Sequence, residues 1–80
     1  MSDYISTVDE FAKLMKERLK AKEAKWGRPE DYTLGEMRLG LLDEIREWGR
    51  SIDTGQEDEE LLDVACYAFL IWYLRRRGRR

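Results

Sequence analysis

Apolar side chains recur at intervals of three and four residues in the first part of the chain. This spacing predicts an amphipathic helix over residues 8–24, with a polar opposite face. Its apolar positions are Phe11, Leu14, Met15 and Leu19. Thr7 followed by Glu10 has the form of a capping box, in which each side chain bonds a backbone amide at the helix start. We therefore expect a first helix that begins just after Thr7.

A second helical pattern follows a predicted loop. The segment KWGRPEDY, residues 25–32, carries the only proline of the chain and a glycine, and this composition breaks a helix. Thr33 and Glu36 then form a second capping box, which opens a helix reaching about residue 52. The apolar positions of this helix are Leu34, Met37, Leu41, Leu42, Ile45, Trp48 and Ile52. Such a regular stripe predicts that one side of the helix packs against the core.

The third pattern is apolar on every side. After the polar segment SIDTGQED, Asp58 or a neighbour would cap a helix ending near residue 76, where arginines complement the helix dipole. Residues 64–74 carry no charge, so at about 100° per residue the whole cylinder is apolar. Two neighbouring helices do not easily cover such a cylinder. We therefore expect an all-α fold of three helices per chain, completed by oligomerisation into a helical bundle, as a homodimer or homotetramer.

The composition narrows the class of protein. The 80 residues make one small domain, 1–80, with 42% hydrophobic and 40% charged residues and a net charge of −2. The longest uncharged run is eleven residues, shorter than the roughly 20 that span a bilayer, and the N-terminus lacks a signal-peptide pattern. We expect a cytoplasmic protein with no membrane partner.

The residue inventory also limits the possible chemistry. The chain has no histidine, which excludes histidine metal sites and histidine bases. The single cysteine, Cys66, excludes an internal disulfide and a cysteine-type zinc site, and its apolar surroundings predict a buried structural thiol. Any site must therefore use carboxylates, lysine, arginine or tyrosine.

Four carboxylates occupy positions where burial is expected. Glu44 and Glu47 lie along the second helix, and Glu60 and Asp63 lie at the start of the third; each pair is spaced at i and i+3, on one helix face. Unpaired carboxylates near a dry core are costly, and clustering adds mutual repulsion. A positive group should lie between them. An arginine or a hard divalent cation, Mg²⁺ or Mn²⁺, would serve.

The helix dipole offers a simpler reading of some of these acids. Acidic residues are favoured in the first turn of any helix, which accounts for the run at residues 57–60 without a ligand. Asp63 lies beyond that turn and is not explained in this way.

The order and flanks of these motifs resemble a known family. DEIRE at residues 43–47, then twelve residues, then ELLD at residues 60–63, resembles the E-E-x-x-E and E-x-x-D signature of MazG-like all-α nucleotide pyrophosphohydrolases. The segments DVACYAFLIW and KWGRPEDYTLGEM are similar to the flanks of the motif in short members. Asp43 replaces the first Glu of the motif, and Cys66 stands where many short members have Asn.

The resemblance implies an enzyme that hydrolyses a nucleoside triphosphate, standard or non-standard, to a monophosphate and pyrophosphate with Mg²⁺ or Mn²⁺. It also implies roles for particular residues, which we carry over to matching positions. The metal ligands would be Glu44, Glu47, Glu60 and Asp63. Glu47 would also serve as the general base.

Substrate contacts are expected from the segment before the second helix. Basic side chains there could reach the phosphates, and an aromatic ring could stack on the base. The substrate-binding residues would be Lys22, Lys25, Trp26 and Arg28.

Two other classes of function stay open from the sequence. The tail RRRGRR, residues 75–80, could attract nucleic-acid phosphates without sequence choice. Alternatively, the chain could be a catalytically silent helical oligomerisation module. In that case Arg38, Arg46 or Arg50 would pair with the carboxylates in place of metal.

Overall fold

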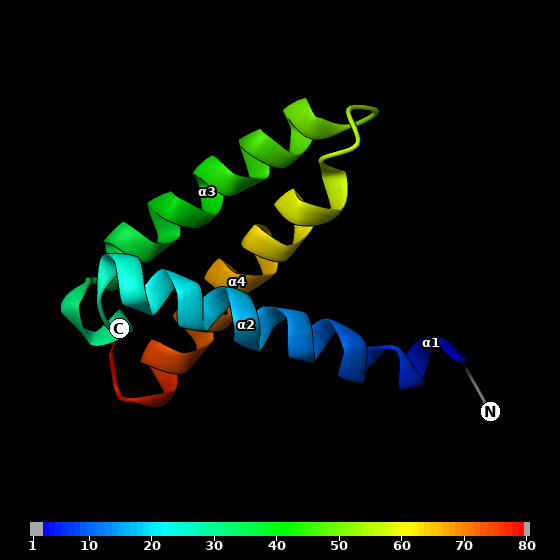
Figure 1. The fold of residues 1–80 in the computed structure, drawn as a ribbon. Helices are drawn as coiled ribbons and strands as arrows, with labels where there is room; N and C mark the ends of the chain where they lie inside the picture. Colours follow the sequence, from blue (N-terminus) through cyan, green and yellow to red (C-terminus); the bar gives the residue numbers. More distant parts are fainter. Residues whose placement is uncertain (1–2, 80) are drawn as a thin grey trace.

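Three long helices dominate the computed structural model, which describes residues 3–79 (Figure 1). In chain order the elements are α1 (Asp3–Ser6), α2 (Val8–Trp26), the 3-10 helix η1 (Pro29–Asp31), α3 (Leu34–Ser51) and α4 (Glu57–Arg76). No strand occurs among these described residues. The predicted all-α class is therefore confirmed, and the first long helix extends two residues beyond its predicted end.

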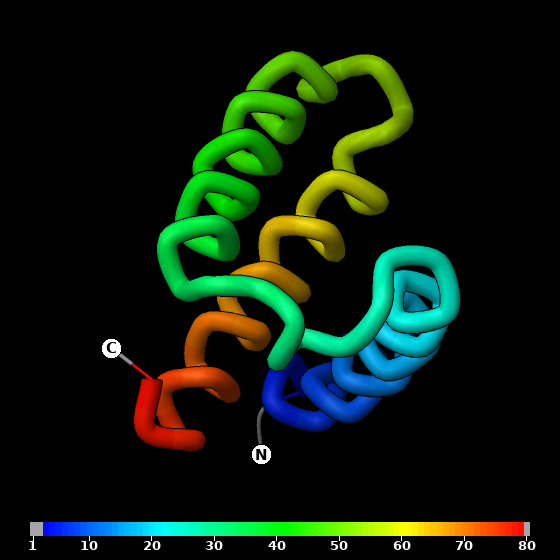
Figure 2. The backbone as a smooth tube through the Cα atoms, turned by 90° about the vertical axis from the view of Figure 1, so that its left-hand side faces the viewer, coloured from blue at the N-terminus to red at the C-terminus, as the bar shows by residue number. Residues whose placement is uncertain are grey.

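The apolar helix α4 is the central element. Helices α3 and α4 form an antiparallel hairpin, and α2 crosses the other side of α4, so that α4 lies between them (Figures 1 and 2). The core is centred on Leu34 and Met37 of α3 and Leu70 and Leu74 of α4. Because α2 and α3 pack on two different sides of α4, apolar residues are required on more than one face of this helix.

The two predicted capping boxes have different outcomes. At the start of α3 the Thr33 hydroxyl accepts from the Glu36 amide at 3.0 Å, and the Glu36 carboxylate accepts from the Thr33 amide at 2.8 Å. This box is confirmed. The box at Thr7 is wrong, because Thr7 has helical backbone angles and its hydroxyl donates to the Tyr4 carbonyl at 2.6 Å. The upstream turn α1 already provides carbonyl acceptors, so the Thr7 amide bonds the Asp3 carbonyl.

The N-cap of α4 also differs from the expectation. Asp58 or a neighbour was expected to cap the helix, but Gln56 occupies the cap position and its side chain makes no capping hydrogen bond. Asp58 lies inside the first turn with three other acids, where the helix dipole favours negative charge.

The predicted core stripe of α3 is only partly buried. Leu34 and Met37 lie in the core, but Leu42, Ile45 and Ile52 are 51%, 41% and 46% exposed. Prediction of these three as core positions is wrong for the single chain, because α4 covers one side of α3 and no other helix of the described chain packs on its outer side.

Burial of Cys66 agrees with the sequence. Its side chain is fully buried on the α4 face that also holds Leu62, Leu70 and Leu74. Burial raises the pKa of the Cys66 thiol, which disfavours the reactive thiolate. Among residues 3–79, no helix is long and apolar enough to cross a membrane.

Candidate metal centre

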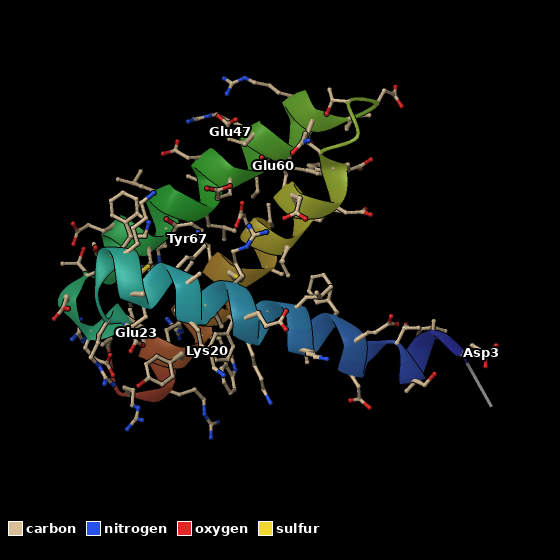
Figure 3. All side chains as sticks on the ribbon, viewed as in Figure 1. Asp3, Lys20, Glu23, Glu47, Glu60 and Tyr67 are labelled. Carbon is tan, nitrogen blue, oxygen red and sulfur yellow. The ribbon has the colours of Figure 1, made fainter. Side chains whose placement is uncertain are left out.

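Three carboxylates converge between α3 and α4. One oxygen from each of Glu44, Glu60 and Asp63 lies within 4.8 Å of the others, and all three residues are partly buried. Figure 3 shows Glu60 in the region between the two helices. Glu60 and Asp63 share a face of α4 because they are one turn apart, and the antiparallel packing places Glu44 opposite them. Carboxylate oxygens are the ligands that hard divalent cations prefer, so the donor set suits Mg²⁺ or Mn²⁺.

Glu47 lies outside this group. Its carboxylate is exposed and accepts a hydrogen bond from Arg50 at 2.8 Å (Figure 3). Glu44 and Glu47 have the same i, i+3 spacing as Glu60 and Asp63, so the spacing alone does not distinguish the two pairs; Glu47 differs because its side chain lies in solvent and bonds Arg50 of its own helix. The structure thus brings together three of the four predicted ligands. The roles of Glu47 as ligand and base stay predictions.

Two cations from α2 meet the carboxylates of α4. Arg18 donates from Nη1 to Asp63 Oδ1 at 2.5 Å and from Nη2 to Glu59. Lys22 Nζ lies 3.6 Å from the same Asp63 oxygen. Arg18 and Lys22 are one turn apart and therefore share the face of α2 that meets α4. These contacts hold α2 against the acidic end of α4.

Arg18 was not among the residues singled out from the sequence. It sits 45 residues from Asp63, and its only local signal is that it shares a helix face with Lys22. Of the three arginines considered as partners for the four carboxylates, Arg50 does pair with one of them, Glu47, at 2.8 Å on an exposed part of α3. Arg46 pairs instead with Asp43 at 3.0 Å, and Arg38 is exposed.

The surroundings of Glu44 disfavour its charged form. Burial is the main cause that raises the pKa of the Glu44 carboxyl, and the nearby charge of Asp63 adds to it. Lys22 acts in the opposite direction, and Glu60 raises the pKa further through its charge and a hydrogen bond. A carboxylate with this environment gains from a bound cation, because the cation relieves both desolvation and repulsion.

The hydrogen bonds of Arg18 also change the pKa of its own guanidinium. Burial lowers the pKa of the guanidinium, but hydrogen bonds and charges from Asp63 and Glu59 outweigh burial and raise it. The side chains of Arg18 and Asp63 are only 26% and 17% exposed, so solvent screens this pair less than a surface pair.

An aromatic cavity of about 480 Å³ lies between α2, η1, α3 and α4, and its lining does not include Glu44, Glu60 or Asp63. Among its lining residues are three of the four predicted substrate-binding residues, together with several tyrosines. These are Lys22, Trp26, Arg28, Tyr32, Tyr67 and Tyr73. Lys22 connects the two regions, because its ammonium lies 5.4 Å from the Tyr67 ring centroid as well as near Asp63.

Lys25, the fourth predicted substrate residue, is exposed and does not line the cavity. Its ammonium lies 5.0 Å from the centroid of the Trp26 ring. The structure therefore places Lys25 next to a cavity residue without giving it a contact inside the cavity.

The arginine-rich tail folds back on the wall of the cavity. Arg79 donates to the carbonyls of Tyr32 and Glu30, both at 2.8 Å, and the Tyr73 hydroxyl donates to the Glu30 carboxylate at 2.6 Å. The Tyr73 hydrogen bond is the main cause that lowers the pKa of Glu30. Arg80 lies outside the described residues. Because Arg79 already donates hydrogen bonds to carbonyls of its own chain, this residue is less available to bind nucleic-acid phosphates.

The chain matches no protein-family model, no curated protein and no solved structure.

Proposed function

We propose that the chain is a Mg²⁺-dependent nucleoside triphosphate pyrophosphohydrolase of the MazG-like type. Water would hydrolyse the phosphoanhydride bond between the α and β phosphates, and the products would be a nucleoside monophosphate and pyrophosphate. The observation that carries this proposal is the convergence of Glu44, Glu60 and Asp63, together with an aromatic cavity that Lys22 connects to Asp63. Mn²⁺ is an alternative cation for the same oxygen donors.

Electrostatics supports a role for metal in this reaction. A triphosphate is repelled by a carboxylate cluster, so the two can approach only with cations between them. Bound Mg²⁺ would supply that charge and acidify a water molecule. Glu44, Glu60 and Asp63 would hold the cation, and Glu47, after turning from Arg50, would accept the proton of the attacking water.

The aromatic cavity supplies a place for the nucleoside. Trp26 and Tyr32 offer ring faces for a base, and Arg28 offers positive charge at the same wall. Lys22 lies between this cavity and Asp63, a suitable position for contact with the phosphates once it leaves the carboxylate.

We also propose that the chain works as a homodimer or homotetramer. The support is the number of large apolar side chains that one chain leaves exposed on α1, α2 and α3. They include Tyr4, Ile5, Val8, Leu14, Leu39 and Leu42. A small domain that buries little surface gains stability when a second copy covers such positions.

Pyrophosphate release with an Asp63 variant tests the activity. The full chain is incubated with Mg²⁺ and a panel of standard and modified nucleoside triphosphates, and pyrophosphate is quantified separately from orthophosphate. Asp63→Ala should lower the rate by at least about a hundredfold, a loss typical of a group acting in the transition state. Asp58→Ala, which removes an exposed acid from the same helix, should retain the activity.

Loss of folding must be separated from loss of chemistry. Asp63 also bonds Arg18, so helix content of each variant is checked by circular dichroism, and Glu60→Gln serves as a second ligand variant. The proposal is wrong if no nucleotide yields pyrophosphate, or if folded Asp63→Ala and Glu60→Gln both keep wild-type rates.

One observation favours a second candidate, the silent oligomerisation module. Asp63 is paired with Arg18 and Lys22 of the same chain, so protein cations already offset its charge. In that case Mg²⁺ would leave the unfolding temperature unchanged, whereas a bound ligand raises it by mass action.

A further inference from the structure

We propose that Arg18 is a built-in counter-cation of the metal centre, which a divalent ion must displace from Asp63 before the site can work. This inference rests on the proposed function, because it concerns regulation of the same carboxylates. It assigns Arg18 a part in metal affinity, in addition to packing α2 on α4.

The guanidinium of Arg18 makes two hydrogen bonds to α4. Its Nη1 donates to Asp63, which belongs to the converging carboxylates, and its Nη2 donates to Glu59, which does not. Glu59 and Asp63 are one turn apart on α4, a separation that a guanidinium fork can span. Asp63 is mostly buried, while the side chain of Glu59 is 62% exposed.

A metal ion and Arg18 compete for Asp63. A divalent ion binds carboxylate oxygen at about 2.0–2.6 Å, and Arg18 approaches an oxygen of the same carboxylate almost as closely. Lys22 adds a second positive charge to that oxygen. Three cations around one partly buried carboxylate repel one another strongly. Metal binding therefore requires that at least the hydrogen bond from Arg18 Nη1 to Asp63 breaks.

Glu59 provides the position to which Arg18 can withdraw. After displacement from Asp63, the guanidinium can keep its second hydrogen bond, to Glu59, at the exposed edge of α4. The helix α2 then stays docked while the metal site opens. Arg18 would thus lower the affinity for metal in the absence of substrate and leave the fold intact.

Metal affinity, measured without nucleotide, tests this exchange. Mn²⁺ is titrated into the full chain, and free Mn²⁺ is followed by electron paramagnetic resonance. Arg18→Gln should bind Mn²⁺ roughly tenfold tighter than wild type, which corresponds to about 1.4 kcal/mol. Lys20→Gln makes the same charge change on the same helix at an exposed residue, and its affinity should change little (Figure 3).

Arg18→Lys separates charge from shape. It keeps the positive charge beside Asp63, so its Mn²⁺ affinity should stay near that of wild type. Circular dichroism confirms that each variant is folded.

Failure of the inference differs from failure of the proposed function. If wild type binds Mn²⁺ and folded Arg18→Gln binds it equally or more weakly, the exchange is wrong while the metal centre stands. The exchange is also wrong if Arg18→Lys and Lys20→Gln tighten binding as much as Arg18→Gln does. Absence of Mn²⁺ binding in wild type and all variants overturns both proposals.

Discussion

At the scale of single residues, the carboxylates of the site differ in how their charge is balanced. Asp63 receives Arg18 and Lys22 from α2, whereas Glu44 faces Asp63 and Glu60 across the hairpin. Burial, with added repulsion from the neighbouring carboxylates, raises the pKa of Glu44. Two acids of one site are therefore in opposite situations, one paired with cations and the other repelled by the charges of its neighbours.

This asymmetry predicts that ionised Glu44 lowers the free energy of unfolding, by an amount that depends on pH. Between the ordinary glutamate pKa of about 4.3 and the raised pKa of Glu44, the folded chain holds a proton that the unfolded chain lacks. Raising the pH through that window therefore lowers the free energy of unfolding. Glu44→Gln should be more stable than wild type above the window, and the difference should vanish as the pH falls to about 4. Urea unfolding in a chelator, at several pH values, measures it.

Glu47→Gln is the control for this measurement. It removes a carboxylate from an exposed position of the same helix, so the comparison isolates the buried location of Glu44. A Glu44→Gln variant that is no more stable than wild type at neutral pH would contradict the assignment of Glu44 to a costly, desolvated position.

Residue-level prediction from sequence succeeded where the cause was local. The one-turn spacing of Glu60 and Asp63 and the inward position of Glu44 follow from helix periodicity, and these three residues do meet. Arg18 could not be found in this way. Its partner lies on another helix, and the crossing of α2 over α4 depends on tertiary packing that periodicity does not specify.

At the scale of elements, a glycine allows α3 and α4 to pack closely. A Cβ atom at Gly40 would lie 2.4 Å from Cε1 of Tyr67, well inside normal contact distance. The Tyr67 ring therefore lies directly over the backbone of α3. Because Tyr67 lines the aromatic cavity, this close approach also fixes one wall of the candidate substrate site.

Substitution of Gly40 should separate this packing from helix propensity. Gly40→Ala gains about 1 kcal/mol of helix propensity but forces the Tyr67 ring or the helices apart, at a cost of roughly 1–3 kcal/mol. We expect a net loss of about 1 kcal/mol in urea unfolding. Gly49→Ala, on the same helix with no atom within 4 Å of the added Cβ, should stabilise by about 0.5–1 kcal/mol.

A second background tests the cause of the loss at Gly40. With Tyr67→Ala the obstructing ring is gone, so adding Gly40→Ala should become stabilising, as at Gly49. Equal stabilisation by Gly40→Ala and Gly49→Ala in the wild-type background would show that the two helices do not pack as closely as described.

Element boundaries show what local signals can and cannot predict. Thr33 and Glu36 form their box because the backbone is extended at Tyr32 and Thr33, so the turn of η1 does not continue into α3 and the first amides of α3 have no helical carbonyls before them. Thr7 and Glu10 have the same sequence form, but α1 supplies a preceding helical turn. The distinction lies in the residues before Thr7, which the capping motif does not include.

At the scale of the whole molecule, α2 and α3 cover two sides of α4, but nothing in the described chain covers the outer sides of α2 and α3 themselves. Figure 1 shows α1 and the first half of α2 extending away from the α3–α4 hairpin. Phe11 and Leu14 on this extension are 39% and 50% exposed, and the outer line of α3 exposes Leu42 and Ile45. The sequence predicted helices and apolar faces; it did not predict which faces a single chain leaves open, since that depends on the number and crossing of the helices.

The last prediction concerns the assembly that would cover these faces. Sedimentation of the wild-type chain at tens of micromolar should give at least twice the mass of one chain, because exposed apolar stripes on a small domain favour self-association. Leu42→Ser with Ile45→Ser should shift the mass toward the monomer without loss of helix content, since neither residue belongs to the core of the chain. Arg38→Ser, at an exposed position of the same helix, should leave the mass unchanged. A monomeric wild type would contradict the assembly, and the α3 outer face would then be solvent-exposed in the working protein.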